Sequence, residues 1–229
     1  MKGKSLVPVL CMMVILLSGC ASTKEKKQNI LGVNGMIYDF SNKPVTDVQV
    51  LVNGKKSSIS DINGHFSLIN ISLGKAYAME FVKPEYETVY FDFHFTDSSQ
   101  IIYVSMASGK QLLDAAEKSL KQSEWKTASD FLERAEKAGA HATGVAYLRA
   151  TLAYLRKEYS GAYAILDTLI SSEIREPYIF LFAADLLQYH LDDPDTAIIR
   201  LEQFLDIQFD PDVQARLDEL RKTTNHENR

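Results

Sequence analysis

The chain has 229 residues, with 30 acidic against 25 basic side chains and a formal net charge of −5. This acidic balance argues against nucleic acid as a partner, because phosphate binding depends on clustered Lys and Arg. Both cysteines, Cys11 and Cys20, fall within the first 20 residues. Residues 21–229 therefore cannot form a disulfide, a thiol nucleophile or a thiolate metal site.

The first segment, residues 1–19, has the composition of a leader. Lys2 and Lys4 give it a basic start, and residues 6–17 are almost continuously apolar. That run is too short to cross a membrane as a helix, which takes about 20 residues, but it suits the apolar centre of a signal peptide. Without the two lysines the remaining chain carries a net charge of about −7.

The leader ends in Leu-Ser-Gly-Cys, and this ending resembles the lipobox of bacterial lipoproteins. The resemblance implies cleavage before Cys20 and acylation of this cysteine, so that a lipid membrane is one partner; the alternative is an ordinary secretory leader. Ala21 and Ser22 lack the aspartate that often retains such proteins at the inner membrane, which favours the outer membrane of a bacterial cell envelope. Residues 20–29 are then a polar, lipidated tether.

Residues 30–107 show the pattern of strands joined by turns, with alternating apolar residues and frequent Gly, Asn, Asp and Pro. Val48, Val50 and Val52 share one face and lead into Asn53-Gly54, a strong hairpin signal. A second turn is predicted over residues 60–64, and further strands over residues 77–82, 88–95 and 100–105. We expect an all-β sandwich.

Several segments of this region resemble the carboxypeptidase regulatory-like domain, a prealbumin-like (transthyretin-like) β-sandwich of about seven strands. The segments that carry the resemblance are residues 35–39, 43–45, 48–50, 60–66, 73–77 and 85–87. The resemblance implies an accessory module that stabilises, spaces or binds and does not hydrolyse peptides. A related short sandwich, such as the PEGA type, is the alternative.

Two features of the sandwich invite a functional interpretation. Asp61, Asn63 and Gly64 echo part of a calcium loop, but the closing Glu is missing, so a turn is the favoured interpretation. Tyr86, Tyr90 and Phe93 lie in an aromatic-rich stretch and are candidates for a surface that binds carbohydrate or cell-wall glycan. Packing in the core and against the next domain is the preferred alternative.

Residues 108–222 have helical periodicity and a repeat. Ala116, Ala150 and Ala184 are spaced at 34 residues, as are Ala128 and Ala162, and this is the period of a tetratricopeptide repeat. The resemblance to tetratricopeptide proteins implies antiparallel helix pairs at about 109–142, 143–176 and 177–210. A capping helix over 211–222 and a frayed tail over 223–229 complete the all-α domain, and we expect one extra residue in the turn of the third repeat.

Such a stack has a concave face lined mainly by the first helix of each pair, which usually holds a peptide or a partner helix. The candidate groove residues are the non-packing positions of those helices: Lys118, Gln122, Tyr147, Arg149, Tyr154, Tyr178, Phe182 and Gln188. For Tyr147, Tyr154 and Phe182, packing between repeats is an equally good interpretation.

No catalytic constellation is visible in the sequence. The five histidines are scattered, and no phosphate loop, zinc-protease motif or nucleophile elbow occurs. The acidic turn at residues 192–195 is predicted to start a helix rather than to bind a cation. We therefore predict no catalytic residues, metal or cofactor, and a lipid-anchored envelope adaptor that binds an envelope protein or peptide. The alternatives are glycan binding by the sandwich and self-assembly of the repeats.

Overall fold

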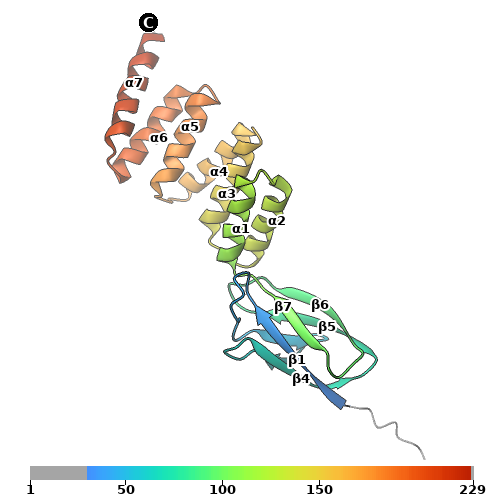
Figure 1. The fold of residues 1–229 in the computed structure, drawn as a ribbon. Helices are drawn as coiled ribbons and strands as arrows, with labels where there is room; N and C mark the ends of the chain where they lie inside the picture. Colours follow the sequence, from blue (N-terminus) through green and yellow to red (C-terminus); the bar gives the residue numbers. More distant parts are fainter. Residues whose placement is uncertain (1–29, 228–229) are drawn as a thin grey trace, which may run out of the picture.

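The computed structural model describes residues 30–227. A β-sandwich comes first and a stack of helices follows it (Figure 1). The predicted fold class, an all-β sandwich followed by all-α tetratricopeptide-like repeats, is confirmed. The predicted leader, the lipidated Cys20 and the tether lie outside the described residues.

The sandwich consists of two facing sheets. Its seven strands within the described residues are β1 (Ile30–Tyr38), β2 (Gln49–Val52), β3 (Lys55–Ile59), β4 (His65–Ser72), β5 (Lys75–Val82), β6 (Val89–Phe95) and β7 (Ile101–Ser105). One sheet has the order β4-β1-β7 and the other β3-β2-β5-β6. The first and last strands pair in parallel, from Asn34 opposite Ile101 to Tyr38 opposite Ser105, while the other pairs are antiparallel.

Local sequence explains the turns. Asn53 and Gly54 both have positive φ, at 50° and 75°, and join β2 to β3 in the predicted hairpin. This is the conformation that a two-residue hairpin with right-handed strand twist requires. The predicted turn before β4 forms as well, since the Asp61 carboxylate accepts hydrogen bonds from the N–H groups of Asn63 and His65.

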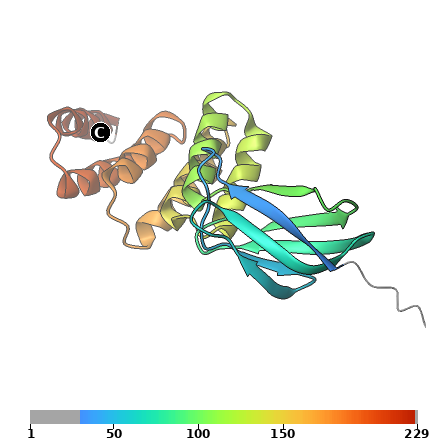
Figure 2. The same cartoon turned by 60° about the horizontal axis from the view of Figure 1, so that its bottom comes forward.

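The sandwich core comes from alternate residues of both sheets. Val48 and Val50 are fully buried, and Phe66 of β4 meets Phe81 of β5 edge to face, with ring centroids 5.5 Å apart. Burying each such side chain stabilises the fold by roughly 1.5–3 kcal/mol. Figure 2 shows the strands side on, with the helices leading away from one end of the sandwich.

The described part of the chain contains seven helices. They are α1 (Gly109–Lys121), α2 (Trp125–Lys137), α3 (Ala142–Leu155), α4 (Tyr159–Ser171), α5 (Pro177–Tyr189), α6 (Pro194–Ile207) and α7 (Pro211–Glu227). The first six form three antiparallel pairs, and α7 covers the last pair. Because neither Gly nor Pro follows Lys222, α7 runs past its predicted end, so the predicted tail is helical as far as Glu227.

Small residues occupy the crossings between these helices. The alanines of the repeat have no exposed surface; they are Ala116, Ala128, Ala150, Ala162, Ala184 and Ala197. A methyl side chain lets two helix backbones approach closely without a void. The one-residue shift in the third repeat is present too, since Asp193 caps α6 by accepting a hydrogen bond from the Thr196 N–H and Ala197 takes the buried position.

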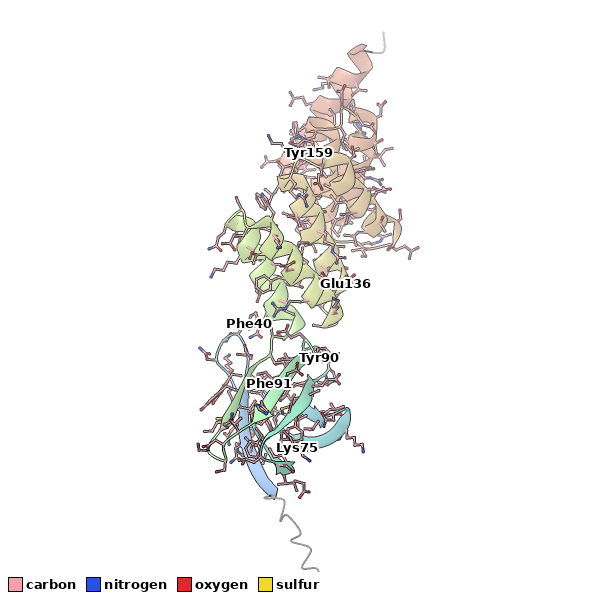
Figure 3. All side chains as sticks on the ribbon, turned by 90° about the vertical axis from the view of Figure 1, so that its right-hand side faces the viewer. Phe40, Lys75, Tyr90, Phe91, Glu136 and Tyr159 are labelled. Atoms are coloured by element: carbon pink, nitrogen blue, oxygen red, sulfur yellow. The ribbon has the colours of Figure 1, made fainter. Side chains whose placement is uncertain are left out.

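The two domains meet at the start of α1. Ser108 caps this helix by accepting a hydrogen bond from the Gln111 N–H, and the Gln111 side chain donates to the Asp39 carboxylate of the sandwich at 2.8 Å. Phe40, which Figure 3 shows where the sandwich meets the helices, packs edge to face against Phe131 of α2. The junction therefore combines polar and aromatic contacts.

Candidate functional site

The concave face of the helical stack carries a hollow of about 730 Å³. It lies between α1, α3 and the start of α5, and its lining residues are Glu117, Leu120, Lys121, Ser123, Trp125, Gly144, Tyr147, Leu148, Thr151, Leu155 and Tyr178. We call this hollow the concave groove. A volume of this size suits a few side chains of a bound segment.

Helical spacing explains why these side chains share one surface. On α3, Tyr147, Thr151 and Leu155 are four residues apart and form one stripe. Tyr178 sits in the first turn of α5, which Pro177 begins, and its ring meets Tyr147 edge to face at 4.9 Å. Gly144 also lines the groove, and a Cβ atom there would lie 3.2 Å from Leu113 Cδ1.

A second, smaller hollow of about 390 Å³ continues the surface toward the C-terminus. Its lining residues are Tyr154, Phe182, Asp185, Tyr189, His190 and Arg216. We call it the distal hollow. It joins α3, α5 and α7, so it exists only because the capping helix is in place.

Ring contacts connect the two hollows. Phe182 lies 5.9 Å from Tyr147 and 5.6 Å from Tyr154, centroid to centroid. Tyr154 in turn contacts His190, which stacks face to face on Tyr159 at 4.0 Å. Figure 3 labels Tyr159 within the helical stack. The aromatic residues thus pack between repeats and at the same time form the wall of the concave face.

The charges beside these hollows are paired within the chain. Lys121 contacts Glu117 at 2.6 Å, four residues earlier on α1. Arg216 of α7 contacts Asp185 at 2.7 Å and also donates to the Gln188 side-chain oxygen. These internal pairs leave the wall between them apolar and aromatic.

Burial changes the acidity of two phenols in the concave groove. Burial raises the pKa of the Tyr147 hydroxyl. The pKa of the Tyr178 hydroxyl is also raised, first by burial and then by the negative charge of Glu176. Both phenols are therefore neutral near pH 7 and can donate as well as accept a hydrogen bond.

The structure brings together part of the predicted groove set. Tyr147 and Tyr178 line the concave groove, while Tyr154 and Phe182 line the distal hollow. Gln188 holds Arg216 at the edge of the distal hollow. These aromatic side chains pack against one another and also line the two hollows.

The other predicted groove residues lie elsewhere. Lys118 and Gln122 line neither hollow. Their neighbours Glu117 and Lys121 line the concave groove instead. One residue of register is a rotation of about 100° around a helix, which is enough to turn a side chain off a face. Arg149 points toward α2, where it pairs with Glu136 at 2.7 Å.

Sequence reasoning missed Trp125, Thr151, Leu155, Tyr189 and Arg216. Spacing contained a signal for two of them, because Thr151 and Leu155 follow the predicted Tyr147 by four and eight residues. No spacing in the sequence pointed to Arg216. Its place depends on how α7 packs against α5.

The predicted aromatic surface on the sandwich is wrong for Phe93. This ring is only 6% exposed and belongs to the core, where it packs beside the buried Phe95 on the inner face of β6; the Phe91 ring, which stacks on Phe93, is itself exposed. Tyr90 points the other way and is 76% exposed, and Figure 3 shows it on the sandwich. Tyr86 is half-buried beside Ser108 at the junction, so the three residues do not form one platform.

Among residues 30–227 no group of three or more His, Asp, Glu or Cys side chains is arranged to hold a metal ion. Of the helices in this same range, none combines the length and the apolar character needed to cross a membrane. His65 Nδ1 lies 3.9 Å from Asp61 Oδ2, its neighbour in the turn. The concave face is therefore the most developed candidate site in the described part of the chain.

No family model matches this chain, and no curated protein matches it. Among solved structures, the chain is similar to the first TPR domain of the human RPAP3 protein, with a TM-score of 0.45 and 13% identity over 52% of this chain and 94% of that one. It is also similar to a chain of a C-terminal interface mutant of the type II Cohesin-X-Dockerin complex from Acetivibrio cellulolyticus. That second likeness has a TM-score of 0.30 and 17% identity, and it covers 34% of this chain and 58% of the other.

This chain thus spans less than two thirds of the length of the Cohesin-X-Dockerin chain that it matches. At such scores and identities neither likeness indicates a ligand. The assignment of a sandwich and a tetratricopeptide-like stack rests on the strand order, the helix pairs and the buried alanines.

Proposed function

We propose that this protein is a non-catalytic adaptor whose concave groove binds a segment of another protein. The observation that carries the proposal is the hollow of about 730 Å³ lined by Trp125, Tyr147, Leu148 and Tyr178. Large amphipathic rings of this kind dominate binding at protein interfaces. A repeat stack also offers an extended concave surface that suits a peptide better than a small substrate.

The proposal includes a lipid anchor at Cys20 that holds the protein in the bacterial cell envelope, on the outer membrane. The Leu-Ser-Gly-Cys ending of the leader supports it. The shape of the fold is compatible with an anchor, since β1 begins at the end of the sandwich away from the helices and the concave groove lies beyond the other end (Figure 1). The sandwich, which resembles carboxypeptidase regulatory-like modules, would then act as a spacer.

Crosslinking in intact cells of the native organism tests the adaptor role. A discrete envelope protein should crosslink to the full-length chain and be lost when residues 108–229 are removed. A double variant, Tyr147→Ala with Tyr178→Ala, should weaken the same crosslink, whereas Tyr90→Ala on the sandwich should leave it unchanged. Retention of the crosslink in the truncated chain would contradict the proposal.

Membrane fractionation tests the anchor separately. Replacement Cys20→Ser should move the protein from the membrane fraction to the soluble fraction, because the acylated sulfur and amino group would be lost together. Unchanged membrane association of this variant would contradict lipidation at Cys20 and leave the groove proposal intact.

A further inference from the structure

The tyrosines of the concave face have unused hydroxyl groups. Tyr147 and Tyr178 line the concave groove and Tyr154 and Tyr189 the distal hollow, and within the described residues none of the four hydroxyls has a hydrogen-bond partner. Tyr163 of α4 differs, since its hydroxyl donates to Asp167 and accepts from Arg200. Four such hydroxyls therefore lie along the concave face. In the described part of the chain, exposed hydroxyls without a partner also occur on the sandwich, at Tyr90 and Tyr103, so it is the grouping of the four beside aromatic rings that marks this face.

The wall that carries these hydroxyls has no free charge. Helix α3 contains one ionisable cation, Arg149, which is held by Glu136 on α2. The one charged residue of α5, Asp185, is paired with Arg216. A charged segment would lose its hydration here without gaining a partner, so the surface favours an uncharged one.

Hydroxyl groups beside aromatic rings favour a segment whose own backbone is available for hydrogen bonding. An amphipathic helix presents an apolar stripe and has already used its backbone groups internally. A polyproline II segment has no internal hydrogen bonds and exposes its carbonyl oxygens. Proline also lacks an N–H group, so it needs only donors, and its ring packs against aromatic side chains in grooves that recognise such segments.

We propose that the concave face binds an uncharged, proline-rich segment of a protein partner in the polyproline II conformation. This inference rests on the adaptor function proposed above and names the chemistry of its ligand. The hydroxyls of Tyr147 and Tyr178 donate to carbonyl oxygens of the segment, and the rings of Trp125 and Tyr147 contact its proline side chains.

Trp125 supplies the measurement, because it is the single tryptophan of the chain and lines the concave groove. Its fluorescence is followed while the purified protein is titrated with an acetylated and amidated decaproline peptide. A matched uncharged peptide of Ala, Leu and Gln that forms a helix, and a Gly-Ser peptide of equal length, serve as competing probes. We expect saturable binding of decaproline and at least tenfold weaker binding of the other two.

Variants separate the hydroxyls from the rings. The double variant Tyr147→Phe with Tyr178→Phe keeps both rings and should weaken decaproline binding about thirtyfold, since two hydrogen bonds of about 1 kcal/mol each are lost. Tyr90→Phe, which changes an exposed hydroxyl on the sandwich, is the matched control and should bind as the unchanged protein does.

The inference is overturned if decaproline fails to saturate at millimolar concentrations, if the helical peptide binds as tightly, or if the double Phe variant binds unchanged. Its failure can be told from failure of the adaptor function. If a native partner crosslinks through residues 108–229 but decaproline does not bind, the polyproline inference is wrong and the adaptor function still stands.

Discussion

Arg134 of α2 holds the carboxylate of Glu87, so a residue of the helical stack and a residue of the sandwich form one ion pair across the junction. The Arg134 Nε donates to Glu87 Oε2 at 2.9 Å and Nη2 donates to Oε1 at 3.0 Å. The same carboxylate also accepts from the Ala107 N–H at 2.9 Å. The Glu87 side chain is only 13% exposed, and the guanidinium lies over the rings of Phe40 and Phe131.

Replacement Arg134→Ala should weaken the contact between the sandwich and the helical stack. The variant leaves a mostly buried carboxylate with one donor instead of three, and we expect a loss of about 1–2 kcal/mol in the free energy of unfolding. Urea denaturation followed by circular dichroism measures this loss. Small-angle scattering should also show a wider spread of domain orientations.

The matched control is Arg149→Ala, because Arg149 forms a similar bidentate pair with Glu136 inside the helical domain. Glu136 is exposed, so this pair should contribute less than about 1 kcal/mol. Equal effects of the two replacements would mean that burial of Glu87 adds nothing at the junction.

Replacement Gly35→Ala should destabilise the sandwich by about 1–3 kcal/mol through overpacking. A Cβ atom at Gly35 would lie 2.2 Å from the Phe66 ring and 2.9 Å from the Ile102 carbonyl oxygen. Gly161→Ala is the control, because a Cβ there meets nothing within 4 Å and alanine favours the helix α4. The midpoint temperature of thermal unfolding should therefore fall for Gly35→Ala and rise slightly for Gly161→Ala. An unchanged midpoint for Gly35→Ala would contradict the packing of β1 against β4.

Replacement Ala150→Leu should disrupt the stack of helices. Ala150 has no exposed surface at the crossing of the second pair, so added methyl groups force the helices apart at a cost of about 1–3 kcal/mol. The same substitution at the exposed Ala164 of α4 should change the free energy of unfolding by less than about 0.5 kcal/mol. Similar denaturation midpoints for the two variants would argue against close helix contact at position 150.

Acid should weaken the Asp39 contact at the junction. Burial tends to raise the pKa of Asp39, but hydrogen bonds from the Lys43 N–H, the Gln111 side chain and the Ser41 N–H outweigh it and leave the pKa below its usual value. A carboxyl whose pKa is lower in the folded than in the unfolded chain adds stability above the unfolded pKa of about 4. This contribution is lost as the pH falls through the folded pKa.

The pH dependence can be isolated with Asp39→Asn, which cannot ionise. The difference in the free energy of unfolding between the two proteins should be largest near neutral pH and shrink below about pH 4. A difference that stays constant from pH 7 to pH 3 would show that ionised Asp39 is not what stabilises the folded state.

Much of the fold could be predicted from residues close together in the chain. Asn53-Gly54 specified a hairpin because few residues adopt positive φ at two consecutive positions. The alanines at a period of 34 specified helix pairs because each pair must bury one small residue where its helices cross. These patterns also placed Tyr147 and Tyr178 on the first helices of their repeats, where both line the concave groove.

Other features were decided only by packing between distant residues. The direction of Phe93 depended on which face of β6 met the opposite sheet, since both faces carry aromatic side chains. Arg134 and Glu87 are 47 residues apart, and their contact needs the loop before β6 to reach the start of the stack. Periodicity determines which side chains share a face of one element, whereas only the packing of whole elements determines which faces meet.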